Sequence, residues 1–194
     1  THVFDANRQN KIRWQIGANY ADKDVAETKN FGPTILDGSE TVVDGTLTNV
    51  DDTTALYSKD TYDYFTYLSI QDEWRIENNL SLVMGIRFDN YETFGSTVNP
   101  RTTLIWHATE KLTSKIQYGS AFRAPTSNEL FFRNNPVYIG NENLDPEEID
   151  TIELSFDYQW SKNLLTNITW YQFDAKNIIE FVFDPASGEN IAQN

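Results

Sequence analysis

Apolar and polar side chains alternate with a period of two along most of the chain, and helical periodicity is hard to find. In the segment KIRWQIGANY, Ile12, Trp14 and Ile16 share one face, and Arg13 and Gln15 share the other. Successive side chains of a β-strand point to opposite faces, so this pattern predicts a strand with one apolar and one polar face. The pattern recurs at 62–76, 80–91, 101–107, 112–120, 151–160 and 164–173. We therefore predict an all-β, antiparallel up-and-down meander of seven strands, with the start of an eighth after Asn190.

The predicted connections between these strands alternate between long and short. Tight turns are expected at 77–79, 108–111 and 161–163, and longer loops at 21–60, 92–100, 122–148 and 184–189. Alternate connections of an antiparallel meander lie at opposite ends, so one end would carry every long loop. Outer-membrane β-barrels have short periplasmic turns and longer extracellular loops. The loop pattern therefore favours a segment of a large transmembrane β-barrel.

Aromatic side chains near the strand ends agree with this interpretation. Trp14, Tyr20, Trp106, Tyr118 and Trp170 all lie on predicted apolar faces. Membrane barrels carry such residues in girdles at the two interfaces, and their lumen-facing side chains are polar. A polar average composition does not argue against a membrane location, because alternating strands average out. The alternative is a β-sandwich, in which two apolar faces meet in a core.

Composition and short motifs exclude several classes of function. The formal net charge of −14 argues against nucleic-acid binding, which needs clustered Lys and Arg. The absence of cysteine excludes disulfides, thiol catalysis and cysteine-based metal sites. There is no G-x-S-x-G, P-loop or H-E-x-x-H pattern, and the carboxylates of Glu147 and Glu148 lie beside no nucleophile. We therefore expect no enzymatic activity and no cofactor.

Several stretches carry a family resemblance. The stretch YGSAFRAPTSNELF, from Tyr118 to Phe131, is followed by GNENLDPEEIDTIELSFDYQW, from Gly140 to Trp160. Together with YLSIQDEWRIENNLSLVMGIRFDNY, FGSTVNPR and WYQFDAKNIIEFV, these stretches resemble the TonB-dependent outer-membrane receptors. The resemblance is dense from Tyr62 to the end of the chain, and the sequence before it is generic.

This resemblance implies a single-chain barrel of about 22 strands, blocked by a plug domain, in the outer membrane of a Gram-negative bacterium. Such receptors import scarce, large ligands, usually ferric siderophores and sometimes haem, cobalamin or saccharides. The inner-membrane TonB complex drives this transport. Residues 1–194 show no plug, no energy-coupling motif and no C-terminal aromatic strand, so we expect them to form one partial barrel domain. The implied partners are the ligand, outer-membrane lipid and, through the missing N-terminal plug region, the TonB complex.

The polar stretch at about 122–148 is expected to be an extracellular loop. Pro125 stops the preceding strand, because proline lacks an amide donor and restricts Ala124 before it. Arg123, just inside the rim, has two interpretations: it pairs with an acidic wall residue or with an anionic ligand. Aromatic and arginine side chains are usual anchors for planar anionic ligands. The ligand-facing candidates are Arg123, Asn128, Phe131, Phe132, Arg133 and Tyr138.

The first long loop is acidic, and its carboxylates are Asp22, Asp24, Glu27, Asp37, Glu40, Asp44, Asp51, Asp52 and Asp60. Clustered carboxylates suit Ca²⁺, but no EF-hand pattern is present, so a solvated loop is the preferred interpretation and no metal site is predicted. Haem ligation by histidine is poorly supported, because 126–138 contains none and His107 is expected near a periplasmic turn. Tyr138 stays open as a haem ligand. Acidic loops do not attract anionic siderophores at long range, although basic residues in the lumen could compensate locally.

Two other classes of protein stay open at this point. A passive outer-membrane porin or adhesin would lack a plug. A soluble β-sandwich binding module would remain a monomer without detergent, whereas the exposed aromatic side chains of a barrel segment would cause aggregation or membrane partition.

Overall fold

The computed structural model of the chain describes residues 2–5, 9–30, 46–51, 53, 55–133, 138–186 and 188–194. The chain divides into two compact units. The first, which we call the wall unit, comprises Thr1–Asn19, Tyr64–Arg123 and Glu147–Asn177. The second, which we call the loop unit, comprises Tyr20–Asp63, Ala124–Pro146 and Ile178–Asn194.

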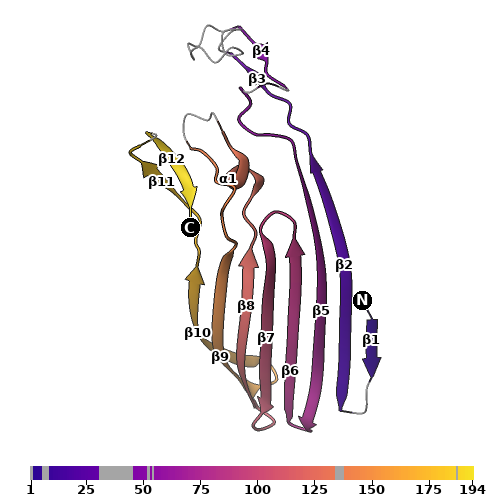
Figure 1. Cartoon of the computed structure of the whole chain (residues 1–194). Coiled ribbons are helices and arrows are strands. Elements are labelled where there is room, and N and C mark those ends of the chain that lie inside the picture. Colours follow the sequence, from indigo (N-terminus) through magenta and orange to yellow (C-terminus); the bar gives the residue numbers. More distant parts are fainter. Residues whose placement is uncertain are drawn as a thin grey trace. The chain divides into compact units, whose positions relative to one another are not determined.

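One eight-stranded sheet forms the wall unit, and two of its strands continue into the loop unit (Figure 1). The strands lie in the order β1–β2–β5–β6–β7–β8–β9–β10, so each neighbours the next long strand in the chain. The registers from β5 to β10 are all antiparallel. The strand bounds are β1 His2–Asp5, β2 Asn10–Lys23, β5 Thr61–Glu77, β6 Leu80–Tyr91, β7 Gly95–His107, β8 Leu112–Arg123, β9 Glu147–Ser161 and β10 Leu164–Lys176. The seven predicted strands and the antiparallel meander are therefore confirmed.

The two ends of the chain differ from the prediction. β1 was not predicted, and it pairs with β2 in register His2 to Trp14. The predicted eighth strand after Asn190 corresponds to β12 (Glu189–Gln193), which does not join the main sheet. It pairs instead with β11 (Glu180–Asp184) in a separate two-stranded hairpin. Asn177 explains the change of direction, because it takes a positive φ of 53° directly after β10 and ends the strand there.

The predicted loop at 92–100 is also wrong. The connection between β6 and β7 is a turn at 92–94, and β7 begins at Gly95, whose φ of 92° suits glycine. Pro100 misled the prediction, because proline cannot donate a ladder hydrogen bond. Pro100 pairs with Ile86 of β6, but the register between β7 and β8 begins only at Arg101. The proline therefore lies where β7 has a strand on one side only. Long and short connections consequently do not alternate strictly.

The apolar side chains of the wall unit lie on one exposed face of the sheet. A continuous apolar row crosses five strands, and it consists of Leu82, Leu104, Ile116, Leu154 and Trp170. Ile16 is 69% exposed and Ile168 is 65% exposed. The buried apolar side chains of the described residues are Val50, Ala55, Leu56, Leu130, Leu144 and Ala192, and all belong to the loop unit. Among the described residues the apolar side chains of this sheet are exposed and form no core with a second sheet, so the β-sandwich interpretation is wrong.

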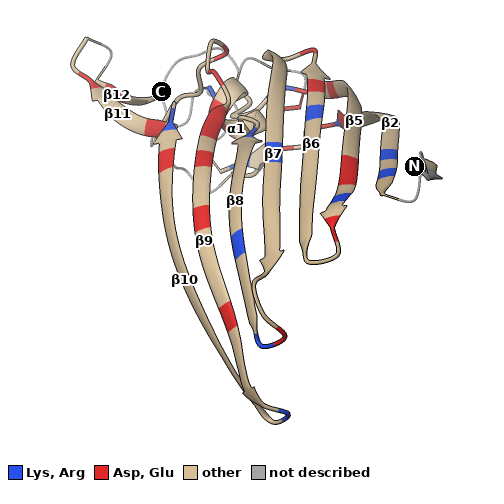
Figure 2. Ribbon diagram, turned by 90° about the horizontal axis from the view of Figure 1, so that it is seen from below, with Lys and Arg blue, Asp and Glu red and all other residues tan. Residues whose placement is uncertain are grey.

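The opposite face, which we call the polar face, carries side chains paired within strands and across neighbouring strands. Lys115 Nζ lies 2.8 Å from Asp157 Oδ2, and the amide of Asn167 donates to the same carboxylate. Arg87 binds the fully buried carboxylate of Asp89 through two hydrogen bonds of 2.6 and 2.7 Å. Figure 2 shows basic segments on β2 and β8, acidic segments on β9, and segments of both signs on β5 and β6. Hydrogen bonds therefore satisfy the carboxylates of Asp89 and Asp157 on this face.

The loop unit contains short elements around two small apolar clusters. β3 (Thr28–Lys29) pairs with β4 (Thr48–Asn49), and nearby Val50, Ala55 and Leu56 form one cluster with Val25. α1 (Ser127–Phe131), which the sequence analysis did not predict, contributes to the second cluster. No helix in the described parts of the chain is long and apolar enough to cross a membrane.

Candidate ligand-facing site

The helix α1 begins at a capping box directly after Pro125. The side chain of Thr126 accepts a hydrogen bond from the Glu129 amide, and the Glu129 carboxylate accepts one from the Thr126 amide at 2.7 Å. These bonds satisfy amides that a helix start otherwise leaves without a partner. The pattern T-x-x-E was visible in the sequence and could have predicted the helix. It places Asn128 and Phe131 on a defined turn instead of an irregular loop.

Backbone contacts hold α1 against later parts of the chain. The Gly140 amide donates to the Phe132 carbonyl, and the Asn141 amide donates to the Glu129 carbonyl, both at 2.8 Å. A side chain at position 140 would place its Cβ 2.7 Å from the Leu130 carbonyl carbon, so only glycine fits this approach. Leu130 is buried with Leu144 and Ala192, with Phe131 and Ile179 against them, and this packing completes the cluster.

Three aromatic rings stack beside this cluster, and we call them the aromatic stack. The rings of Phe132 and Tyr138 lie 5.1 Å apart and nearly parallel, and those of Tyr138 and Phe181 lie 4.3 Å apart. Lys59 extends over the neighbouring Phe131 ring, with Nζ 4.3 Å from the ring centroid, and also pairs with Glu142 at 2.8 Å. Aromatic faces next to a cation offer a surface for planar or anionic ligands.

The structure distributes the six predicted site residues over both units. Five of them, Asn128, Phe131, Phe132, Arg133 and Tyr138, lie in the loop unit, where Phe132 and Tyr138 are in direct contact. Asn128 accepts a hydrogen bond from Lys23 Nζ at 3.4 Å. The Arg133 side chain is exposed, and its backbone amide donates to the Tyr57 carbonyl.

Arg123 belongs to the wall unit and has an acidic partner. It is the last residue of β8, and it lies opposite Glu147, the first residue of β9. Arg123 Nε and Nη2 donate to the two carboxylate oxygens of Glu147 at 2.6 and 2.7 Å. The structure therefore shows the ion-pair interpretation of Arg123, and a role in ligand binding remains a prediction.

Sequence analysis missed Lys59 and Phe181 as members of the candidate site. Both are distant in the chain from the 122–148 stretch, and no local pattern links them to it. Phe181 belongs to an apolar run, EFVF, which indicates a strand and says nothing of its neighbours. The structure places His107, the histidine considered for haem, at the end of β7, where its ring contacts Thr113 Oγ1 at 2.9 Å.

The acidic first loop contains a buried lysine. The Lys29 ammonium bonds the Ala55 carbonyl and lies 3.1 Å from the centroid of the Tyr57 ring. Burial lowers the pKa of Lys29 below its usual range, although the nearby Glu27 carboxylate acts in the opposite direction. Burial also raises the pKa of the Tyr57 phenol, and Glu27 adds to that rise.

The remaining acidic residues of this loop are only partly described. Asp37, Glu40, Asp44 and Asp52 lie outside the described residues. Two of the described carboxylates of this loop bind backbone amides: Asp60 accepts from Val25 at 2.7 Å, and Asp51 accepts from Glu27 at 2.6 Å. Within the described parts of the chain, no three acidic or histidine side chains gather as a metal site.

Comparison with known proteins identifies the family of this chain. Residues 2–194 match the family described as TonB dependent receptor-like, beta-barrel. A vitamin B12 transporter, BtuB, of Vibrio cholerae is 32% identical over 119 residues, which cover 61% of this chain and 18% of the transporter. An iron-regulated outer membrane virulence protein of the same species is 31% identical over 124 residues, covering 61% of this chain and 19% of that protein. The chain thus spans about a fifth of the length of these curated relatives.

Solved structures show the same fold at lower sequence identity. The FrpB iron transporter of Neisseria meningitidis superposes with a TM-score of 0.68 at 15% identity, covering 99% of this chain and 29% of FrpB. The ferric enterobactin receptor PfeA of Pseudomonas aeruginosa superposes with a TM-score of 0.65 at 18% identity, covering 95% of this chain and 32% of PfeA.

The fold and the family match together define a segment of an outer-membrane receptor barrel wall. The chain belongs to the TonB-dependent receptor-like β-barrel family, as the resemblance in its sequence predicted. Like its relatives, it is a protein of the outer membrane of Gram-negative bacteria. In such barrels the apolar face of the wall contacts lipid, and the polar face lines the lumen.

Proposed function

We propose that the protein takes part in the energy-coupled uptake of a ferric siderophore or a similarly scarce, large ligand across the outer membrane. The observation that carries the proposal is the family match over residues 2–194. The exposed apolar face of the wall unit supports contact with outer-membrane lipid. Coupling to the TonB complex would act through the plug region that the family resemblance implies.

Cobalamin is a second candidate ligand. The relative that is 32% identical over 119 residues is a vitamin B12 transporter, whereas another relative of similar identity is iron-regulated. Identity at this level does not choose between the two ligands, because recognition in such receptors depends on loops whose sequences vary more than the wall.

The proposed ligand contacts are the six predicted residues together with Lys59 and Phe181. The aromatic stack offers ring surface, and Arg133 offers an exposed guanidinium. Asn128 and Phe131 lie on α1. Arg123 would contribute only if an anionic group of the ligand competes with Glu147 for the guanidinium.

Growth of a host that lacks its own receptors would test the proposal. The receptor carrying this sequence is expressed in that host, and growth is measured on ferric chelates under iron limitation and on cobalamin under cobalamin dependence. We expect growth on one ligand class, and loss of that growth when the TonB complex is deleted. Growth that persists without the TonB complex would instead favour a plugless porin.

Substitutions in the loop unit would test the proposed contacts. We expect Arg133→Gln and Phe181→Ala to weaken ligand binding at the cell surface. Lys162→Gln, in the turn between β9 and β10, and Tyr171→Ala, on β10, are matched controls outside the loop unit. Equal binding by all four variants would remove these residues from the site.

A further inference from the structure

The hairpin of β11 and β12 in the loop unit has one covered edge and one open edge. On the β12 side, the Ile139 amide donates to the Asn190 carbonyl at 2.7 Å, and the Ala192 amide donates to the Ile139 carbonyl at 3.0 Å. On the other side, β11 pairs with β12 and with no further strand among the described residues. The outer edge of β11 is therefore a strand edge that another chain can join.

The register of the hairpin shows which backbone groups this edge presents. Asn190 and Ala192 direct backbone groups toward Ile139, away from β11. Their partners in the register are Phe183 and Phe181. Both pairs are therefore non-hydrogen-bonded pairs, in which the backbone groups of the two residues point away from each other. The amides and carbonyls of Phe181 and Phe183 consequently point outward, and no other described residue bonds them.

The two faces of β11 differ in chemistry. Phe181 and Phe183 share one face, because successive side chains of a strand alternate, and they are 43% and 59% exposed. Glu180, Val182 and Asp184 share the other face, on which the exposed valine lies between two acidic residues. The open edge thus has an aromatic face and an acidic face.

The charge of the hairpin restricts what can pair with this edge. Residues 178–194 contain Glu180, Asp184 and Glu189, and they contain no Lys or Arg. A second copy of β11 would bring carboxylates against carboxylates, and like charges on opposed strands are destabilising. A strand with basic side chains on the acidic face and apolar side chains on the aromatic face complements both faces.

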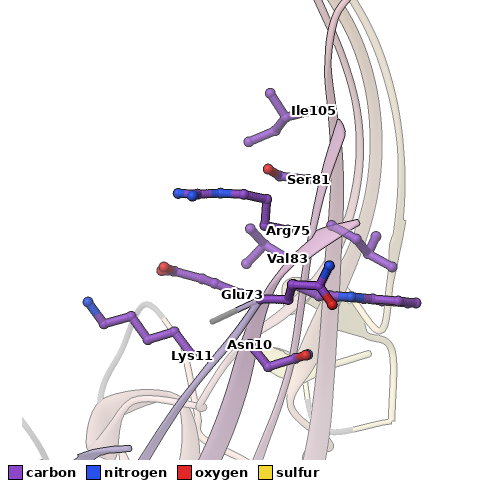
Figure 3. A pocket seen from close by; sticks show the side chains of 10 residues that line it. Asn10, Lys11, Glu73, Arg75, Ser81, Val83 and Ile105 are labelled. Carbon is purple, nitrogen blue, oxygen red and sulfur yellow. The ribbon is translucent and has the colours of Figure 1, made fainter. Parts of the chain in front are cut away.

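Strand edges of the wall unit are occupied by comparison. A closed barrel leaves no edge, so further wall strands would cover the outer sides of β1 and β10. Within the sheet, β2, β5 and β6 border a hollow of about 530 Å³, where the Arg75 amide donates to the Gln9 carbonyl at 2.7 Å. Figure 3 shows Glu73 and Arg75 projecting to one side of the sheet there, and the Glu73 carboxylate binds Arg13.

The open edge lies on the connection that leaves the wall at its loop end. β9 begins at Glu147, directly after the stretch 124–146, and β10 runs antiparallel to β9. β10 therefore ends where β9 begins, and β11 follows it at that end. In outer-membrane barrels the end with the longer loops is extracellular. A partner of β11 would thus approach from outside the cell.

We propose that the outer edge of β11 binds an extended polypeptide from outside the cell by strand addition, and that this polypeptide alternates basic and apolar side chains. Its backbone would bond the outward groups of Phe181 and Phe183. Its apolar side chains would lie beside these rings, and its basic side chains beside Glu180 and Asp184. Main-chain bonds give affinity in such complexes, and alternate side chains give specificity. The inference goes beyond the proposed uptake function and does not depend on it.

Peptide binding to the whole receptor, purified in an uncharged detergent, would test this inference. The probe is the fluorescent peptide Lys-Val-Lys-Phe-Lys-Val-Lys, and fluorescence anisotropy gives its Kd. One control peptide replaces every lysine with glutamate. A second control peptide is methylated on its backbone nitrogens, so it keeps the side chains but cannot donate to a strand edge.

Two substitutions at Phe183 separate the backbone from the ring. Phe183→Ala and Phe183→Pro both remove the ring, but only proline removes the outward amide. Proline is tolerated on an edge strand where the lost amide faces away from the partner strand. Glu180→Gln tests the acidic face, and Glu110→Gln, in the turn at 108–111, is its matched control. Hydrogen exchange at the Ile139 amide, which bonds β12, reports whether the hairpin stays folded.

We expect the wild type to bind the basic peptide and neither control peptide. Phe183→Pro should bind about 3- to 10-fold more weakly than Phe183→Ala, the size of one net hydrogen bond. Glu180→Gln should also bind more weakly than Glu110→Gln, and this difference should shrink at high salt, because ions screen exposed charges.

Three results would overturn the inference. The first is failure of the wild type to bind the basic peptide, and the second is equal binding of the methylated peptide. The third is equal affinity of Phe183→Pro and Phe183→Ala with unchanged exchange at Ile139. If Phe183→Pro unfolds the hairpin, the two peptides on the wild type decide. Receptor dimers that form without peptide and that Phe183→Pro disperses would assign the edge to a second copy instead.

Discussion

Arg123 and Glu147 face each other across β8 and β9 and join through two hydrogen bonds of 2.6 and 2.7 Å. This pair lies where the wall unit ends and the stretch 124–146 begins, so it closes the two strands at the base of that stretch. A fork of two parallel N–H···O bonds fixes direction as well as distance. The Arg123 guanidinium, which the sequence analysis considered as a ligand contact, therefore binds a carboxylate of the wall unit.

The two possible roles of Arg123, as a structural ion pair and as a ligand contact, predict different results. Both side chains are partly exposed, so Glu147→Gln should cost only about 0.2–1 kcal/mol in the free energy of unfolding. Arg123→Gln should cost a similar amount, measured by the temperature at which the folded receptor loses its gel mobility. If Arg123 only closes the strands, both variants bind ligand equally. A weaker ligand affinity in Arg123→Gln alone would assign the guanidinium to the ligand.

Removal of Arg87 should destabilise the wall more than removal of its partner. Asp89 is fully buried, and two hydrogen bonds from Arg87 satisfy its carboxylate. Arg87→Met leaves a buried carboxylate without this partner, which costs about 1–3 kcal/mol or more. Asp89→Asn removes the charge as well, so we expect a smaller loss. Urea unfolding of the receptor in liposomes measures both variants, and an equal or reversed order would contradict the prediction.

Gly140→Ala should disrupt the contact between α1 and the segment that follows it. The added Cβ would lie 2.7 Å from the Leu130 carbonyl carbon and 2.8 Å from the Phe131 amide nitrogen, and backbone atoms cannot move aside cheaply. We expect faster hydrogen exchange at the Asn141 amide, which bonds the Glu129 carbonyl. Gly119→Ala is the matched control, because its Cβ would meet nothing within 4 Å. Unchanged exchange at Asn141 would show that the contact tolerates a side chain.

Tyr138→Ala should loosen the aromatic stack. It removes two ring contacts, each worth about 0.5–1.5 kcal/mol beyond the buried area. Hydrogen exchange at the Ile139 amide, which donates to the Asn190 carbonyl at 2.7 Å, should accelerate. Tyr138→Phe keeps both rings and should exchange like the wild type. If Tyr138→Phe is as fast as Tyr138→Ala, the phenol oxygen and not the stack holds this segment.

Acidic pH should break the hydrogen bond that the Asp51 carboxylate accepts from the Glu27 amide. The hydrogen bond from the Glu27 amide, followed by one from the Asn49 side chain, lowers the pKa of Asp51 below its usual 3.8. A depressed carboxylate pKa stabilises the folded loop above the unfolded value, and this stabilisation is lost as pH falls through the folded value. The Glu27 amide should therefore show constant protection at neutral and mildly acidic pH, and lose it below 3.8. In Asp51→Ala the amide should be unprotected throughout, so pH-independent protection in that variant would refute the assignment.

Strand prediction was correct where apolar and polar side chains alternate, and it was wrong where a single residue suggested that a strand ended. Ile12, Trp14 and Ile16 alternate with polar neighbours, and β2 follows that pattern directly. Pro100 suggested a loop, yet β7 includes it, because the lost amide matters only on a side that has a pairing strand. Asn190 lies in a strand as predicted, but strand propensity does not select the partner, and β12 pairs with β11.

The sequence could predict only part of the candidate site, and the reason is related. The T-x-x-E pattern at Thr126 was a local signal for α1, because a capping box involves neighbours in the chain. The contacts of Tyr138 with Phe181, and of Lys59 with the Phe131 ring, join distant residues. No local pattern encodes such pairs.

The sequence by itself determined the antiparallel meander, its two chemically distinct faces and the family, because side-chain alternation and local motifs depend only on neighbours in the chain. Only the tertiary structure decided that Arg123 pairs with Glu147, that β12 does not join the main sheet, and that Lys115 pairs with Asp157. The physical reason is that register and long-range contact set which charges meet. A shift of one residue between two strands would turn every one of these side chains to the other face.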